Sequence, residues 1–213
     1  MNVSVIIPTR NAEKYINNLI VRLIDQTVEP IEIIVIDTNS ADETRNICKL
    51  YNKVKFIHIN EGEFNHGKTR NKAANEAIGD ILVFMTQDAI PENNRFIEEL
   101  ILPLGKKNID ASYGRQIPNT DSGEIEKFSR QFNYGDVDIV KSKNDINKFG
   151  VKTFFFSNVC SAFIKEEFFK VGGFPEDTIM NEDMIIASKF IFDGKSTYYS
   201  SNAKVIHSHK YTY

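Results

Sequence analysis

Hydrophobic positions in the first 90 residues switch repeatedly between short apolar runs and a helical spacing. Three of the four runs are rich in Val and Ile, which is typical of strands covered on both faces. The runs occupy residues 3–8, 31–37, 55–59 and 81–86. Between the first two, apolar residues recur every three or four positions and predict an amphipathic helix. Its apolar stripe consists of Ile16, Leu19, Ile20, Leu23 and Ile24.

The segments between the later runs also predict helices. Ser40 and Glu43 have the spacing of a capping box, so a helix is expected to begin near Ala41. A third helix is expected over residues 68–78, where small Ala side chains allow close approach to the sheet and Gly79 ends the helix. Strands that alternate with helices predict an α/β fold with a parallel sheet and right-handed crossovers.

The second half of the chain is less regular. In order, it predicts a helix around residues 96–101, a strand at 111–117, a strand-like run at 154–163, helices at 165–171 and 181–192, and strands at 197–200 and 204–209. Residues 118–150 are polar and weakly periodic, so we expect a long connection that is helical around residues 124–132. Long connections of this kind often act as lids or binding elements.

Composition changes this picture little. The chain has 213 residues, a formal net charge of -3 and a pI near 5.9, which gives no overall attraction to nucleic acid or anionic membrane. Cys48 and Cys160 are too few for a disulfide framework and are expected to be reduced and buried. The N-terminus MNVSVIIPT lacks a charged n-region and leads directly into a strand, so we expect no signal peptide. No apolar run approaches about 20 residues, so we expect no membrane-spanning helix.

Polar side chains gather where the predicted strands end. The first strand is followed by Thr9 and Arg10, the second ends on Asp37, and the fourth is followed by Gln87 and Asp88. If these strands are neighbours, their ends form one rim, which is where open α/β sheets bind ligands. Taken singly, each acid could equally be a turn residue.

Three further groups could carry chemistry. Arg70 lies on the third helix within a basic cluster, although alone it could be a solvated helix residue. Glu182 and Asp183 begin a late helix, where acids either stabilise the helix dipole or serve as a general base at a pocket wall. His207 and His209 share one face of the last strand and could ligate a metal, or be paired surface histidines. A zinc site with Cys160 has no motif spacing.

The ordered motifs resemble a known family. The segments VSVIIPTRN, IVIDTNSADET, HGKTRNKA, ILVFMTQDAIP and NED follow the order seen in inverting family 2 glycosyltransferases with the GT-A fold, and the resemblance covers nearly the whole chain. The variants FNHGKTRN, TQDAIP, KTFFFSNVCSA and VIHSHKY resemble the rhamnosyltransferase branch. The resemblance implies one Rossmann-like domain over residues 1–213, with a nucleotide-binding half at 1–110 and an acceptor and catalytic half at 111–213.

The resemblance also implies roles by position. Thr9 and Asp37 would hold the nucleoside, with Asp37 accepting from the pyrimidine imide N–H. Arg70 would lie beside the base and diphosphate, and Ser157 and Asn158 would lie near the donor sugar. Arg10 and Glu182 would also contact the substrate. Gln87 and Asp88 stand where relatives hold a divalent metal and the diphosphate, and His207 or His209 would either complete the metal site or contact the diphosphate. Asp183, next to Glu182, resembles the general base.

The implied reaction is transfer of a sugar from a nucleotide-sugar donor to a saccharide or lipid-linked acceptor in bacterial surface polysaccharide synthesis, with dTDP-rhamnose as the donor expected first. The enzyme would be cytoplasmic, with peripheral membrane contact left open, and would not bind nucleic acid. Gln87 supplies an amide where a carboxylate is common, so dependence on Mg²⁺ or Mn²⁺ is open. A helix N-terminus is expected to lower the pKa of Asp183.

Two other functions remain. A nucleotidyltransferase usually carries a glycine-rich basic loop after its first strand, whereas PTRNAEKY contains no glycine. A catalytically silent nucleotide-sugar binding module would not need Asp183. Relatives of the rhamnosyltransferase branch continue into C-terminal helices, so this chain is expected to be a truncated or minimal form.

Overall fold

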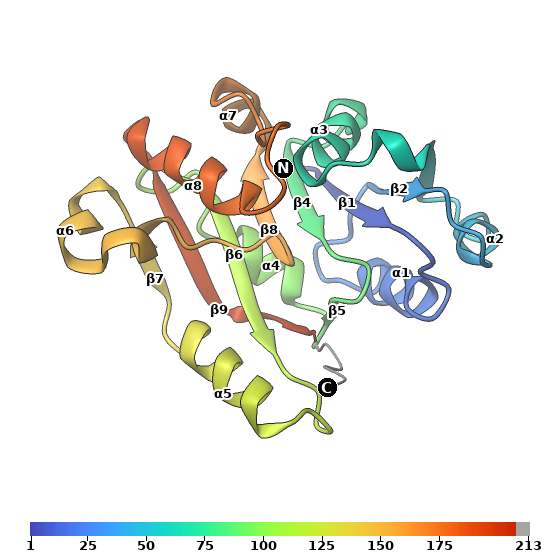
Figure 1. The fold of residues 1–213 in the computed structure, drawn as a ribbon, viewed down its shortest axis with the longest axis horizontal. Coiled ribbons are helices and arrows are strands. Elements are labelled where there is room, and N and C mark those ends of the chain that lie inside the picture. The colour runs from blue at the N-terminus through green and yellow to red at the C-terminus, as the bar shows by residue number, and fades with distance from the viewer. Residues whose placement is uncertain (208–213) are drawn as a thin grey trace.

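The computed structural model describes residues 1–207, which form one nine-stranded sheet with helices on both faces (Figure 1). The strands are β1 Val3–Thr9, β2 Glu32–Thr38, β3 Val54–Ile59, β4 Ile81–Met85, β5 Ile90–Pro91, β6 Ile109–Ile117, β7 Ile139–Lys141, β8 Cys160–Ile164 and β9 Ser196–Ile206. The α-helices are α1 Ile16–Ile24, α2 Thr44–Cys48, α3 His66–Glu76, α4 Phe96–Ile101, α5 Glu124–Asn133, α6 Ile146–Phe149, α7 Lys165–Lys170 and α8 Glu182–Phe192. Short 3-10 turns lie at Glu61–Glu63, Lys143–Asp145 and Gly150–Phe154.

The sheet combines a parallel half with a mixed half. Its order is β3-β2-β1-β4-β8-β6-β9-β5, and β7 pairs with β9. The strands β3, β2, β1 and β4 run parallel, as their alternation with helices predicted. The strand β8 runs antiparallel to both β4 and β6 and joins the two halves. The ends of β2, β1 and β4 therefore lie side by side.

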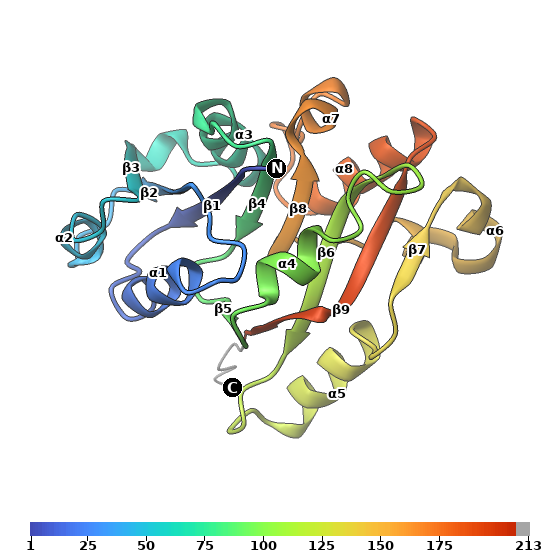
Figure 2. The same cartoon turned by 180° about the vertical axis from the view of Figure 1, so that it is seen from behind.

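Two hydrophobic clusters cover the two faces of this sheet. One contains inward residues of α1 and α4, including Leu19 and Phe96, packed on alternate residues of β1 such as Val5. The other packs α3, α7 and α8 on the opposite face, where Ile6 points. Figure 2 shows α1 and α4 in front of the sheet, with α3 and α8 behind it. Burial on both faces explains why the central strands read as unbroken apolar runs.

Local hydrogen bonds shift several predicted boundaries. The helix expected near Ala41 begins only at Thr44, because the Ser40 hydroxyl donates to Asp37 Oδ1 at 2.5 Å instead of capping a helix. The helix α3 begins two residues earlier than expected, because Asn65 Oδ1 accepts the N–H groups of Gly67 and Lys68.

The second half contains further differences. The run expected as a strand over 154–163 forms a strand only from Cys160, because Ser157 and Asn158 make local side-chain hydrogen bonds that compete with a ladder. The two strands expected at 197–200 and 204–209 are one irregular strand, β9, which ends at Ile206. Among residues 1–207, no helix is long and apolar enough to cross a membrane. Both cysteines are buried and free, as expected.

Candidate functional site

The ends of β1 and β2 are joined by a buried hydrogen-bond cluster. Thr9 pairs with Asp37 across the two strands, and its hydroxyl donates to Asp37 Oδ1 at 2.9 Å. The hydroxyl and the N–H group of Ser40 donate to the same carboxylate at 2.5 and 3.0 Å. Asp37 is 2% exposed, so its carboxylate fixes the turn after β2. Three donors already satisfy it, which leaves less capacity for a ligand.

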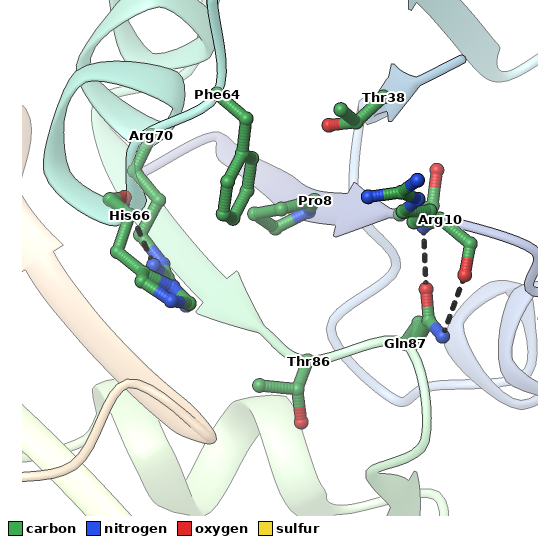
Figure 3. Close-up of a pocket in the computed structure, with 9 residues that line it drawn as sticks. Pro8, Arg10, Thr38, Phe64, His66, Arg70, Thr86 and Gln87 are labelled. Atoms are coloured by element: carbon green, nitrogen blue, oxygen red, sulfur yellow. Dashed lines mark hydrogen bonds between the residues drawn. The ribbon is translucent and has the colours of Figure 1, made fainter. Parts of the chain in front are cut away.

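A pocket of about 240 Å³ lies at this edge of the sheet (Figure 3). The sheet contributes residues at or just beyond the ends of β1, β2 and β4, while Phe64 and two residues of α3 form the opposite wall. The lining residues are Pro8, Thr9, Arg10, Thr38, Phe64, His66, Arg70, Thr86 and Gln87. Apolar Pro8 and the half-exposed Phe64 ring provide surfaces on which a flat ligand could pack.

Two almost fully buried residues of the pocket lining each have a polar atom with no hydrogen-bond partner. The Thr38 hydroxyl is one, and Nε of Arg70 is the other. Both residues are almost fully buried, at 2% and 5% exposure. An unsatisfied buried polar group costs about 1–3 kcal/mol, so such groups require an explanation. A ligand that hydrogen-bonds both atoms would provide one.

Gln87 is held by the main chain of Arg10. The Arg10 N–H donates to Gln87 Oε1 at 2.8 Å, and Gln87 Nε2 donates to the Arg10 carbonyl at 3.2 Å, as Figure 3 shows. This reciprocal pair ties the end of β4 to the end of β1. The Arg10 side chain turns outward to Glu61 at 2.6 Å. The Gln87 amide therefore shapes the pocket floor.

Asp88 lies next to His207, although they are 119 positions apart in the sequence. His207 Nε2 is 3.3 Å from Asp88 Oδ2, and the ring is 4% exposed. Burial raises the pKa of Asp88, but the hydrogen bond and the charge of His207 outweigh it and lower the pKa to about 2. Asp88 is thus an anion at neutral pH. Within residues 1–207 no cluster of three or more His, Cys, Asp or Glu residues could hold a metal. His209 lies outside the described residues.

Arg70 points from α3 toward the first turn of α8. Its Nη1 donates to the His66 carbonyl at 2.9 Å and to Glu182 Oε1 at 3.1 Å. Burial lowers the pKa of this guanidinium, and the carboxylates of Glu182 and Asp183 act in the opposite direction. Asn158 Nδ2 also donates to Glu182 Oε1, at 3.4 Å. Glu182 therefore positions Arg70 and the segment before β8.

Asp183 follows Glu182 and has a raised pKa, contrary to the sequence-based expectation. Burial and the like charge of Glu182 raise the pKa to about 6, although hydrogen bonds from the N–H groups of Met184 and Asn158 and the charge of Arg70 lower it. The Met184 N–H lies 2.8 Å from Asp183 Oδ1. The predicted helix N-terminus is present, but desolvation and the neighbouring carboxylate outweigh it. A carboxylate with a pKa near 6 is suited to accept a proton at neutral pH.

The structure brings the predicted residues together in two groups. Thr9, Arg10, Arg70 and Gln87 line the pocket, and Glu182 and Asp183 adjoin it through Arg70. Asp88 and His207 form the second group, directly after the β4 end, and Ser157 joins it through Gln116. Asp37 lies beneath the pocket lining.

Sequence reasoning missed several residues of both groups. Thr38, Phe64 and His66 line the pocket. Phe64 and His66 belong to the motif FNHGKTRN just before Arg70, so the motif could have indicated them. Gln116 and Arg130 contact His207, and no pattern in the sequence connects those three positions.

Sequence comparison gives the family of this chain. The profile described as "Glycosyl transferase family 2" matches residues 4–171. The chain belongs to glycosyl transferase family 2. It is 46% identical over 188 residues to the "O-antigen chain rhamnosyltransferase WbaN" of Salmonella anatum. That alignment covers 88% of this chain and 59% of the relative, so this chain spans less than two thirds of the relative's length.

Solved structures of glycosyltransferases show that the fold of this chain is GT-A. The structure "S. aureus TarS 1-349 in complex with UDP-GlcNAc" superposes with a TM-score of 0.76 and 22% identity, over 100% of this chain and 60% of that one. The "Mannosyltransferase PcManGT from Pyrobaculum calidifontis in complex with GDP-Man and Mn2+" has a TM-score of 0.73 and 19% identity, over 100% and 58%. The predicted fold class and family are therefore confirmed.

Proposed function

We propose that this chain is an inverting glycosyltransferase that moves a sugar, with rhamnose as the first candidate, from a nucleotide-sugar donor to a saccharide or lipid-linked acceptor in bacterial surface polysaccharide synthesis. The observation that carries the proposal is the pocket at the ends of β1, β2 and β4, with the unpaired Thr38 hydroxyl and Arg70 Nε, and with Asp183 beyond Arg70. The similarity to a protein named as an O-antigen chain rhamnosyltransferase supports rhamnose and a polysaccharide acceptor.

The pocket chemistry fits a nucleoside. A pyrimidine ring could lie against Pro8 and Phe64, while its polar edge meets the Thr38 hydroxyl. The unpaired Nε of Arg70 would donate to the base or to the first phosphate. Because Glu182 holds the other side of the guanidinium, Arg70 is preorganised and loses little conformational freedom on binding.

Transfer would proceed by one in-line displacement. The acceptor hydroxyl oxygen forms a bond to the anomeric carbon as the bond from that carbon to the diphosphate oxygen breaks. The hydroxyl proton passes to the Asp183 carboxylate, whose pKa of about 6 leaves it mostly ionised at pH 7 but basic enough to accept the proton. The bonding electrons leave with the diphosphate, and Arg70 stabilises the charge that develops there.

Asp88 and His207 would hold a divalent cation. Their donor set is one carboxylate and one imidazole, with 3.3 Å between Oδ2 and Nε2, and the diphosphate would supply further oxygens. Imidazole favours Mn²⁺ over Mg²⁺ in such a set. When bound, the cation would neutralise charge on the departing diphosphate.

A thermal-shift screen of dTDP, UDP and GDP sugars, each with and without Mn²⁺, tests the proposal. A ligand at 100 times its Kd stabilises the folded state by about 2.7 kcal/mol, which gives a readily measured shift in Tm. The sugar nucleotide that stabilises best is then supplied with acceptor, and the product is analysed for transfer and anomeric configuration. If no sugar nucleotide shifts the Tm, or the product retains the donor configuration, the proposal is wrong.

A further inference from the structure

His207 is enclosed by polar groups on the side away from Asp88. Its Nδ1 is 2.9 Å from Gln116 Oε1 and 3.2 Å from Arg130 Nη2. Gln116 lies on β6 and is 2% exposed, while Arg130 reaches the ring from α5. Neither residue is needed for the chemistry described above, so their convergence on one ring nitrogen requires its own explanation.

The orientation of the Gln116 amide follows from its neighbours. Arg130 Nη1 donates to Gln116 Oε1, and a guanidinium has donors but no acceptor. The amide oxygen must therefore face Arg130, because the opposite orientation would place two donors against each other. The amide nitrogen then faces Tyr134 Oη at 2.5 Å and Ser157 Oγ at 2.9 Å, both of which can accept. All the hydrogen bonds around Gln116 agree with this one orientation.

That orientation places a proton on His207 Nδ1. An unprotonated Nδ1 would set its lone pair against the Gln116 oxygen at 2.9 Å, which is a repulsive contact. A protonated Nδ1 donates to that oxygen instead. Arg130 Nη2, which is not the nitrogen that donates to Gln116, is farther from Nδ1, at 3.2 Å, so the shorter contact to the Gln116 oxygen decides the proton's position. With Nδ1 engaged, Nε2 is the nitrogen that either hydrogen-bonds Asp88 or ligates a cation.

We propose that Gln116 is a positioning residue that keeps a proton on Nδ1 of His207 and so reserves Nε2 for a divalent cation beside Asp88. Metal-binding histidines generally donate their other nitrogen to an acceptor of this kind, and loss of such an acceptor lowers metal affinity about 10–100-fold. The inference rests on the proposed function, because that function brings a cation and a diphosphate to Asp88.

The first experiment reads the ring directly. The full chain contains four histidines, and ¹⁵N-labelled imidazole shifts, assigned with single His→Asn variants, show which nitrogen of His207 carries a proton. The metal-free wild-type chain, measured near pH 8, is expected to have a protonated Nδ1. Gln116→Leu removes the acceptor, so Nδ1 is expected to be bare and to accept from Arg130, while Nε2 donates to Asp88. A bare Nδ1 in the wild-type chain overturns the role of Gln116.

The second experiment measures Mn²⁺ affinity by electron paramagnetic resonance in the presence of UDP or dTDP. Gln116→Leu is expected to weaken Mn²⁺ binding about 10–100-fold, whereas Gln116→Glu, which keeps an acceptor, stays within a few-fold of wild type. Gln26→Leu is the matched control, because Gln26 is also buried and makes three hydrogen bonds, to Arg22, Asn93 and Ile97, away from the site.

The outcomes separate the two proposals. Equal Mn²⁺ affinity in wild type and Gln116→Leu, or equal losses in Gln116→Leu and Gln26→Leu, refutes the positioning role. Binding of UDP or dTDP in the presence of a chelator is expected to be the same in all four proteins. If the wild-type chain binds neither nucleotide, the proposed function fails, whereas the NMR result still decides where the His207 proton lies.

Discussion

Substitution of Asp183 by Asn is expected to abolish transfer and at the same time to stabilise the folded chain. An Asn side chain keeps an oxygen that can accept the Met184 N–H, which lies 2.8 Å from Asp183 Oδ1. It removes the negative charge that burial and Glu182 disfavour. The same features that make Asp183 basic enough for catalysis therefore make its ionised form costly.

The magnitude follows from the pKa. The pKa of Asp183 is about 6 in the folded chain, against an ordinary value of 3.8 that applies to the unfolded chain. This difference of about two units means that ionised Asp183 lowers the free energy of unfolding by about 3 kcal/mol. The folded chain binds more protons than the unfolded chain between these values, so stability from this group falls as pH rises from 4 to 6. The cost is complete above pH 6. Asp183→Asn should thus gain up to about 3 kcal/mol at pH 7.5 and nothing at pH 4.

Urea unfolding at pH 7.5 and pH 4, with isothermal titration of the nucleotide sugar, measures both effects. Asp193→Asn is the control, because Asp193 is exposed at the opposite end of α8 and should leave stability and transfer unchanged. Loss of a general base typically lowers the rate by about 10²–10⁴-fold, while nucleotide affinity should change little. A variant that is less stable than wild type at pH 7.5, or that loses nucleotide binding as much as transfer, would show that Asp183 is a structural helix-cap residue.

Three further predictions concern other buried polar groups. Asp88→Ala should weaken binding of UDP or dTDP but not of the free nucleoside, in calorimetry with and without Mn²⁺; unchanged diphosphate affinity under both conditions contradicts the diphosphate assignment. Thr38→Val removes a hydroxyl with no partner, so stability should stay within about 0.5 kcal/mol while nucleotide affinity falls about 3–10-fold; the reverse pattern would indicate a structural hydroxyl. Burial lowers the pKa of Lys141 to about 8 from 10.5, so the folded chain binds fewer protons than the unfolded chain above pH 8. The free energy of unfolding of the wild type should therefore rise from pH 8 to 10 relative to that of Lys141→Met. Parallel curves of unfolding free energy against pH, measured with urea, would show that burial of the Lys141 charge has no such cost.

Much of the fold could be predicted because local patterns and burial agree. The apolar runs that became β1, β2 and β4 have both faces covered, and their polar ends therefore had to meet at one edge. The second half was harder, because side chains such as Ser157 and Asn158 bond locally and interrupt a run that otherwise reads as a strand. The strand β7 was missed within a polar segment, since its pairing with β9 is decided by a distant partner.

The sequence by itself determined the family, the order of the elements and the identity of the acids and the arginine at the strand and helix ends. These properties depend on residue type, spacing and neighbours along the chain. Only the tertiary structure decided the pKa values of these side chains and which side chains they contact. The pKa of Asp183 rises, rather than falls as a helix N-terminus alone would dictate, because packing removes water and sets Glu182 beside it. Likewise, Gln116, Arg130 and His207 meet only because β6, α5 and the end of β9 converge. Electrostatic energies depend on distance in space and on exclusion of solvent, and neither quantity is a property of sequence separation.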